Sequence, residues 1–256
     1  MMKPVLQVEN ITKAYGKGAN IYKALNGVSF EVHKGEFVGV MGPSGAGKST
    51  LLNVIATIDS ATTGSIIIDD TNIANMKDEQ LADFRRDNLG FIFQDYNLLD
   101  SLTVRENIVL PLAIAKRPAA EINERVERIA ELFGIADLLD KYPYQISGGQ
   151  KQRTASSRAL VTEPKLLFAD EPTGALDSKS ATDLLENLSE LNAKQQSTIL
   201  MVTHDAYAAS FCQRILFIQD GQLSKEIFRG EETRKQFFQT ILQELTVIGG
   251  DANDVI

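Results

Sequence analysis

The stretch GPSGAGKST, Gly42–Thr50, fits the pattern G-x-x-x-x-G-K-[ST], which is typical of loops that bind nucleotide phosphates. A dense apolar run, EFVGVMG (Glu36–Gly42), precedes it and predicts a buried strand, and STLLNVIATI (Ser49–Ile58) then predicts a helix. Glycines let the backbone curl so that successive N–H groups point inward, and the helix start adds partial positive charge. The order of strand, loop and helix therefore predicts a phosphate site.

The side chains of this loop suggest which residues would contact a bound triphosphate and its metal ion. Lys48 is expected to reach the β- and γ-phosphates, and the Ser49 hydroxyl can ligate Mg²⁺. The other expected nucleotide-binding residues of the loop are Gly42, Ser44, Gly45, Gly47 and Thr50.

Two carboxylates end a second apolar run, KLLFADEP (Lys165–Pro172), which predicts another buried strand. Asp170 is expected to hold Mg²⁺ through its water shell. Glu171 points differently and is expected to accept a proton from an attacking water. Acidic pairs after strands are common, so these two assignments depend on the phosphate loop.

Strands and helices alternate outward from these two motifs, which predicts an α/β fold with a mostly parallel sheet covered by helices. The segment from Thr103 to about Leu160 is helical in pattern and is interpreted as an insertion, because strands before and after it must share one core. The remaining expected elements are a helix at Lys179–Leu191 and strands at Val5–Thr12, Val28–Val32, Ser65–Asp69, Gly90–Phe93, Ser197–His204 and Arg214–Gly221.

The composition is that of a globular protein with a sizeable core. The 256 residues are 43% hydrophobic and 23% charged, enough for one large domain or two small ones. The net charge of −8 and the pI of about 4.9 argue against a nucleic-acid partner, which usually needs a basic patch. The single Cys212 cannot form an internal disulfide and is expected to be a buried apolar residue in a reducing compartment.

No membrane-targeting segment is predicted. The start, MMKPVLQVEN, lacks the features of a signal peptide. The longest apolar run, IVLPLAIA (Ile108–Ala115), contains Pro111 and is far shorter than the roughly 20 residues of a spanning helix. We therefore expect a cytoplasmic protein that meets a membrane only through a partner.

Six short motifs occur in an order that resembles the ATP-binding subunits of ABC transporters, over about Val5 to Phe228. The resemblance implies a P-loop NTPase with a RecA-like core, an N-terminal antiparallel β subdomain and an inserted α-helical subdomain at about 95–160, within an ATP-binding domain at 1–230. It also implies ATP and Mg²⁺ as cofactors. The six motifs are GPSGAGKST, FQDYNLL, ISGGQKQR, LLFADEP, GALD and THD.

The resemblance gives the stretch ISGGQKQR a role across a dimer. In such subunits the loop and helix start of this signature motif meet the γ-phosphate of an ATP that is held by a second copy. Ile146 stands where leucine is more frequent, which is a conservative change. The residues implied to contact that ATP are Ser147, Gly148, Gly149 and Gln150.

Other motif residues gain roles by the same resemblance. Gln94 is implied to reach Mg²⁺ and the attacking water, and His204 is implied to contact the γ-phosphate. Asp177 is implied to line the dimer interface. Tyr15 matches the aromatic residue that stacks on adenine, and Tyr22 remains a rival because the length of the intervening loop is uncertain.

The segment Leu81–Leu112 is similar to the subgroup that powers macrolide-export, lipoprotein-release and bacitracin-resistance systems. Asp100 and Ala175 make it most like the bacitracin-type transporters of antimicrobial peptides. Such transporters pair two ATPase copies with one membrane permease at the cytoplasmic face, and often work beside a sensor histidine kinase. Coupling to the permease is expected near Tyr96–Leu99, and a macrolide or lipoprotein type remains the alternative.

The C-terminal part, 231–256, is predicted to form an amphipathic helix and a tail. In EETRKQFFQTILQEL (Glu231–Leu245), one helical face carries Phe237, Phe238, Ile241, Leu242 and Leu245. The helix could dock on its own domain or on a partner, and GGDANDVI after it is expected to be flexible.

Three rival classes are disfavoured. A soluble ABC-type ATPase acting on DNA would carry long coiled coils between the P-loop and the signature, whereas only about 100 residues without heptads separate Lys48 from Ser147. A GTPase would need an Asn-Lys-x-Asp guanine motif, which is missing. A non-catalytic nucleotide-binding module would not need Glu171 and His204.

Overall fold

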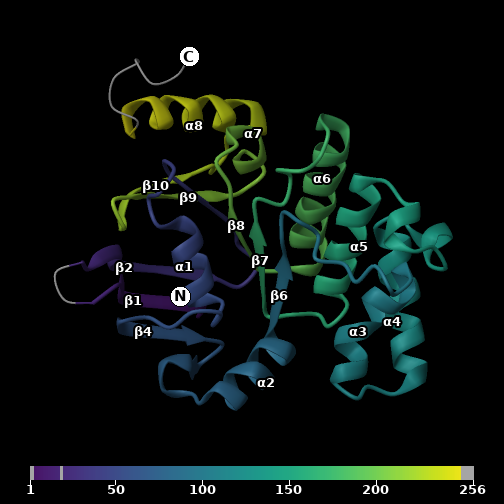
Figure 1. Ribbon diagram of the computed structural model, residues 1–256. Coiled ribbons are helices and arrows are strands. Elements are labelled where there is room, and N and C mark those ends of the chain that lie inside the picture. The colour runs from purple at the N-terminus through teal and green to yellow at the C-terminus, as the bar shows by residue number, and fades with distance from the viewer. Residues whose placement is uncertain (1–2, 18–19, 249–256) are drawn as a thin grey trace.

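Two β-sheets organise the computed structural model, which describes residues 3–17 and 20–248 (Figure 1). The smaller sheet is antiparallel, in the order β2-β1-β4-β5, and the larger has the order β10-β9-β3-β8-β7-β6. In the larger sheet only β10 runs antiparallel to its neighbour. The strands are β1 (Pro4–Tyr15), β2 (Tyr22–His33), β3 (Phe37–Met41), β4 (Thr63–Ile68), β5 (Thr71–Asn72), β6 (Leu89–Ile92), β7 (Leu166–Asp170), β8 (Ile199–Val202), β9 (Arg214–Gln219) and β10 (Gln222–Phe228).

Helices cover the larger sheet and extend beyond its β6 edge. Figure 1 shows α3, α4 and α5 grouped beside β6, while α1 lies on the other side of β7. The α-helices are α1 (Lys48–Ile55), α2 (Asp78–Asn88), α3 (Val104–Ile114), α4 (Ala119–Leu132), α5 (Gly148–Leu160), α6 (Ser178–Gln195), α7 (Ala206–Ala209) and α8 (Arg234–Ile248). Short 3₁₀ turns are η1 (Ile73–Asn75), η2 (Ala136–Leu138) and η3 (Pro143–Gln145).

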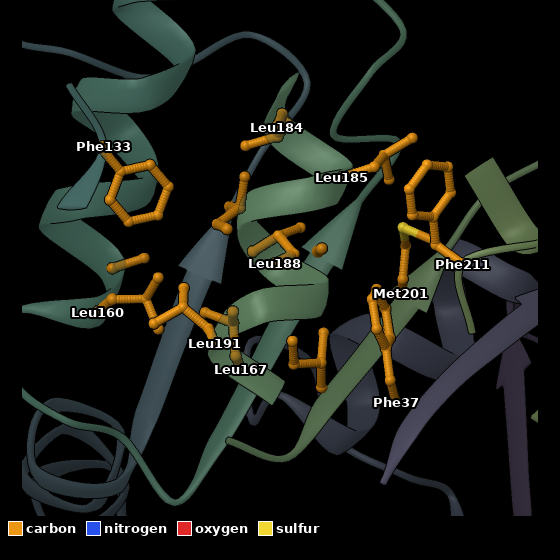
Figure 2. Packing of buried hydrophobic residues seen from close by; sticks show 14 of the residues in the cluster. Phe37, Phe133, Leu160, Leu167, Leu184, Leu185, Leu188, Leu191, Met201 and Phe211 are labelled. Carbon is orange, nitrogen blue, oxygen red and sulfur yellow. The ribbon is translucent and has the colours of Figure 1, made fainter. Parts of the chain in front are cut away.

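The helical block shares its core with the sheet. Four fully or almost fully buried leucines of α6 lie between them, each contributing roughly 1.5–3 kcal/mol by burial (Figure 2). Phe133 and Leu160 of the block pack into the same cluster as Phe37 and Met201 of the strands. The four leucines are Leu184, Leu185, Leu188 and Leu191.

The expected fold class is confirmed. The continuous apolar runs are buried strands of the larger sheet, as parallel strands covered on both faces should be. The helix expected at Ser49–Ile58 ends earlier, at Ile55. Thr57 adopts a left-handed φ of 59° there, and the Arg85 guanidinium donates to its carbonyl at 2.7 Å, so the freed backbone group is satisfied.

Two further findings concern membranes and the C-terminus. In the described part of the chain, every helix is too short or too polar to cross a bilayer. The C-terminal amphipathic helix forms as α8 and docks on its own domain, with Phe237 and Ile241 buried. The tail expected at 249–256 lies outside the described residues.

Candidate functional site

One edge of the larger sheet collects four stretches that are far apart in the sequence. Strands β3, β8, β7 and β6 are parallel neighbours, so their carboxyl ends lie at the same edge. The phosphate loop follows β3, and Gln94 comes two residues after β6. Asp170 ends β7, and His204 comes two residues after β8. The sheet therefore brings together the residues that the sequence placed at a nucleotide site.

The phosphate loop needs glycine for steric reasons. Gly47 has a φ of 100°, and a side chain there would place its Cβ 2.4 Å from the carbonyl oxygen of Ala24. At Gly42 a Cβ would lie 2.0 Å from the carbonyl oxygen of Ile218. Without these glycines the chain could not curl between β3 and α1, so the inward-facing N–H groups would be lost.

Lys48 lies at the mouth of the loop. Its Nζ donates to the carbonyl oxygens of Gly42 and Pro43, both at 2.9 Å. Burial lowers the pKa of Lys48, and the neighbouring carboxylates Glu171 and Asp170 partly oppose that shift. The ammonium group is thus close to both acidic residues and bonded only to neutral carbonyls, which a phosphate oxygen could replace.

Glu171 is held by the segment that carries His204. Its carboxylate accepts the backbone N–H of His204 at 3.0 Å and the hydroxyl of Thr203 at 3.2 Å. The His204 Nδ1 lies 2.8 Å from the same carboxylate. Glu171 also has a left-handed φ of 45°, a conformation that costs a non-glycine residue about 1–3 kcal/mol. Backbone strain and three donors together fix the direction of this carboxylate.

The oxygen donors near this edge fit Mg²⁺. Burial and the adjacent Glu171 raise the pKa of Asp170, which Lys48 partly offsets, so a cation beside Asp170 would relieve a real electrostatic cost. Within residues 3–17 and 20–248, no three His, Cys, Asp or Glu side chains group into a metal cage. Mg²⁺ suits such a site, because it usually takes one or two carboxylates and completes its shell with waters and phosphates. The predicted ligands are Ser49, Gln94 and Asp170.

Gln94 contacts the loop that leads to Asp177. A Cβ added to Gly174 would lie 3.0 Å from the Gln94 amide, so the two segments touch. Asp177 caps α6, because its carboxylate accepts the backbone N–H groups of Lys179 and Ser180 at 3.0 and 2.9 Å. The Asp177 side chain thus has a structural role within its own chain, which the sequence did not indicate.

The signature segment forms a capped helix start. The Ser147 Oγ accepts the N–H of Gln150 at 3.3 Å, and the Gln150 Oε1 accepts the N–H of Ser147 at 2.9 Å. This capping box satisfies two donors and leaves the first-turn N–H groups of Gly148 and Gly149 at an exposed end of α5. Those two amides, more than the Ser147 and Gln150 side chains, are the free donors for an anion.

Both signature glycines lie close to side chains of the same chain. A Cβ on Gly149 would lie 2.5 Å from the Ser180 Oγ, and one on Gly148 would lie 3.0 Å from the Tyr96 Oη. Tyr96 in turn donates to the carbonyl of Ala175 at 3.3 Å. The start of α5 therefore packs beside Gln94 and Asp177 rather than on the phosphate loop, and Figure 1 shows β6 and β7 between α5 and α1.

The two tyrosine candidates are direct cross-strand partners on β1 and β2. Their side chains therefore share one face of the sheet, and they are 43% and 59% exposed. Tyr15 donates to Asp59 at 2.7 Å, and Lys13 bonds the same carboxylate and lies over the Tyr15 ring. The Tyr22 Oη is 3.5 Å from the carbonyl of Gly45. Tyr15 is the better anchored of the two, and both line the approach to the loop.

Sequence reasoning missed two residues of α5 that hold the loop after β6. The buried Gln152 donates to the carbonyls of Phe93 and Pro172, at 3.3 and 2.8 Å. Arg158 donates to the carbonyls of Tyr96 and Asn97, at 3.0 and 2.6 Å. No local pattern marks such contacts, because the partners are 20 to 62 residues away in the sequence.

Cys212 is fully buried, and burial raises the pKa of its thiol, so it is an apolar core residue as expected.

Comparisons with known proteins agree with this geometry. The family model described as "ABC transporter" matches residues 25–174. The chain is 52% identical to the bacitracin export ATP-binding protein BceA of Halalkalibacterium halodurans, over 98% of this chain and 99% of that protein. It is 42% identical to the macrolide export ATP-binding/permease protein MacB of Aggregatibacter actinomycetemcomitans, over 86% of this chain and 34% of that protein. A dimeric structure of the cassette MJ0796 of Methanocaldococcus jannaschii, bound to ADP and Pi, has a TM-score of 0.80 at 39% identity and covers 87% of this chain and 98% of its own.

Proposed function

Because this chain is an ATP-binding and ATP-hydrolysing member of the ABC transporter family, we propose that it powers a membrane permease. The proposed permease removes or exports antimicrobial peptides such as bacitracin. The observation that carries this proposal is the 52% identity to BceA, which extends over almost the full length of both chains. Asp100 and Ala175, in the two motifs that most resemble bacitracin-type systems, support the same substrate class.

A macrolide exporter is the second candidate. The MacB relative is 42% identical and is named as both an ATP-binding protein and a permease. Its lower identity over a smaller part of this chain makes it the weaker proposal. Its name nevertheless supports a permease as the partner of a cassette of this kind.

Two copies of the chain are proposed to enclose ATP between them. The start of α5 packs on its own Gln94 and Asp177 segments and lies across β6 and β7 from α1. Among the described residues, no hydrogen bond joins the start of α5 to the phosphate loop, and the amides of Gly148 and Gly149 lie at an exposed helix end that is open to a partner. A γ-phosphate contacted from both chains would stabilise the closed dimer by mass action.

The chain's own residues then divide the hydrolytic work. The loop amides and Lys48 bind the β- and γ-phosphates, and Lys48 exchanges its two carbonyl partners for phosphate oxygens. Glu171 orients the attacking water and accepts its proton, while His204 and Gln94 position the γ-phosphate and the water. Mg²⁺, when bound at Ser49, Gln94 and Asp170, supplies positive charge against the phosphate oxygens. Tyr15 stacks on adenine.

The permease is proposed to dock in an apolar groove between α3 and the loop after β6. The groove has a volume of about 470 Å³, and its lining includes Phe91, Leu99, Leu110 and Ile114. Leu99 and Ile114, which both line this groove, are 46% and 58% exposed, so they present apolar surface to a partner. Arg158 lies in the same groove and bonds the loop that carries Gln94, so a partner seated there would contact a segment linked to the ATP site.

The cytoplasmic face of the membrane is the proposed location, because ATP is available there and the permease supplies the membrane attachment. Association with a sensor histidine kinase through the permease stays a prediction.

Deletion of the gene, with complementation, tests the proposed substrate. We expect deletion to lower the bacitracin concentration that inhibits growth, without changing the inhibitory concentration of a macrolide. The wild-type gene should restore resistance, and Lys48→Ala should not. Loss of macrolide resistance alone would favour the second candidate, and unchanged resistance to both drugs would refute the proposed substrate class.

A further inference from the structure

Helix α8 packs on α7, the short helix that follows His204 (Figure 1). Phe237 and Ile241 of α8 are fully buried against this region. At the start of α8, the Arg234 guanidinium lies over two rings, 5.4 Å from the centre of Tyr207 and 4.2 Å from that of Phe211. The C-terminal helix thus contacts the segment next to the ATP site.

Tyr207 connects three parts of the site. Its backbone N–H donates at 2.8 Å to the carboxylate of Asp205, the residue that follows His204. Its hydroxyl group lies 3.0 Å from the Thr182 Oγ1, in the first turns of α6. Asp177 caps that same helix. A shift of Tyr207 would therefore displace the backbone at His204. It would also weaken the contact between Tyr207 and Thr182, and so the link between α7 and the helix that Asp177 caps.

Helix α7 depends on tertiary contacts for its position, and its alanines are buried in the core cluster. It has four residues, far fewer than an independent helix needs, and three of the four are alanines. Strand β8 ends at Val202 within the sheet, so the position of α7 determines the path of the three connecting residues, Thr203 to Asp205. The large side chains available as anchors are Tyr207 and Phe211, and Arg234 contacts both.

We propose that α8 is a positioning element of the ATPase site, in which Arg234 acts through Tyr207 to hold the backbone of His204 against the Glu171 carboxylate. This inference rests on the proposed role of His204 at the γ-phosphate. Arg234 touches neither nucleotide nor water, so it is a positioning residue. The helix therefore supports the connecting residues Thr203 to Asp205 in addition to covering the core.

A double-variant cycle on the full chain tests the proposal by ATP hydrolysis. Arg234→Ala should lower kcat about three- to fivefold, the loss expected for one exposed cation–π contact, with KM for ATP changed less than about twofold. Arg234→Lys, which keeps a cation over the rings, should recover most of the rate. In a His204→Ala background, Arg234→Ala should cause almost no further loss, because its effect passes through His204.

One control variant and one further test variant accompany this cycle. Lys235→Ala removes the same charge from the neighbouring exposed residue of α8 and should leave kcat and the thermal unfolding temperature unchanged. Tyr207→Phe keeps the ring but removes the hydroxyl that meets Thr182, and should lower kcat in the same direction as Arg234→Ala.

Three results would overturn the proposal. Arg234→Ala with wild-type kcat would do so, as would an equal loss in the presence and absence of His204. Wild-type hydrolysis by His204→Ala itself would refute the role of His204, and the positioning inference with it, which is a different result from an inert Arg234.

Discussion

The Glu171 carboxylate lies 2.8 Å from Nδ1 of His204 and also accepts the backbone N–H of the same histidine at 3.0 Å. Thr203, the preceding residue, donates to the other carboxylate oxygen. The expected base and the expected γ-phosphate histidine are therefore one hydrogen-bonded unit. Among the described residues, the second carboxylate oxygen accepts only the Thr203 hydroxyl, so it can still accept a bond from a water.

Glu171→Gln should abolish most hydrolysis while ATP still binds. The amide cannot take a proton from water, so kcat should fall at least about 100-fold. Its Oε1 can still accept from His204, so the Kd for ATP should stay within about threefold. Phosphate release and equilibrium nucleotide binding measure the two quantities, and turnover at the wild-type rate would show that Glu171 is not the base.

Mixing two inactive variants should restore activity if the signature works across the dimer. Lys48→Ala disables the phosphate loop, and Ser147→Arg obstructs the start of α5. In a mixed dimer, one site keeps an intact loop and an intact signature from opposite chains, so an equal mixture should reach about a quarter of the wild-type rate. A signature that acted on its own chain would leave the mixture as inactive as either variant.

Tyr15→Ala should weaken ATP binding without slowing the chemical step. Loss of base stacking predicts a KM about tenfold higher with kcat nearly unchanged. Tyr15→Phe keeps the ring and loses only the bond to Asp59, so its KM should rise much less. The matching pair Tyr22→Ala and Tyr22→Phe decides between the candidates, since a larger KM effect at Tyr22 would reverse the assignment.

Asp59→Asn should lower stability in a pH-dependent way. Burial alone would raise the pKa of Asp59, but hydrogen bonds from Lys13, Tyr15 and the backbone of Ser60 outweigh it, so the pKa lies below its usual value. A depressed carboxyl pKa stabilises the fold above pH about 4, and that contribution disappears as pH falls through the folded value. Asp59→Asn should therefore cost about 1–2 kcal/mol at pH 7 and much less near pH 3.

Chemical denaturation at several pH values measures this difference. Asp70→Asn is a suitable control, because Asp70 forms an ion pair with Lys3 in which both side chains are more than 60% exposed. Its effect at pH 7 should stay below about 0.5 kcal/mol. A pH-independent loss at Asp59 would mean that packing, rather than charge, is responsible.

The sequence predicted best what short local patterns determine. Strands β3, β7 and β8 are continuous apolar runs, and the phosphate loop follows from its glycines and Lys48. Helix α2 was missed because it is mostly charged and buries only Phe84, so it shows no apolar stripe. The four residues of α7 are too few to show a period.

Within the site, motif positions were predictable and the contacts that fix them were not. The sequence placed Ser147 and Gln150 at a helix start, but their mutual capping box shows that their side chains are already bonded to backbone. The Asp59 carboxylate that holds Tyr15 lies 44 residues away along the chain. Such partners depend on the packing of α1 against the smaller sheet, which no short pattern encodes.

The two hydrogen bonds of Arg158 couple the position of α5 to that of the loop after β6. The Arg158 guanidinium lies near the end of the 13-residue helix α5 and donates to the carbonyls of two successive residues, Tyr96 and Asn97. These two residues have left-handed φ values of 57° and 50°. Two successive left-handed residues whose carbonyls are bonded to α5 restrict how far the backbone between Gln94 and α5 can change its shape. If α5 tilts, these two bonds would carry the Tyr96–Asn97 backbone with it, so movement of a partner at the proposed docking groove would also move the segment next to Gln94.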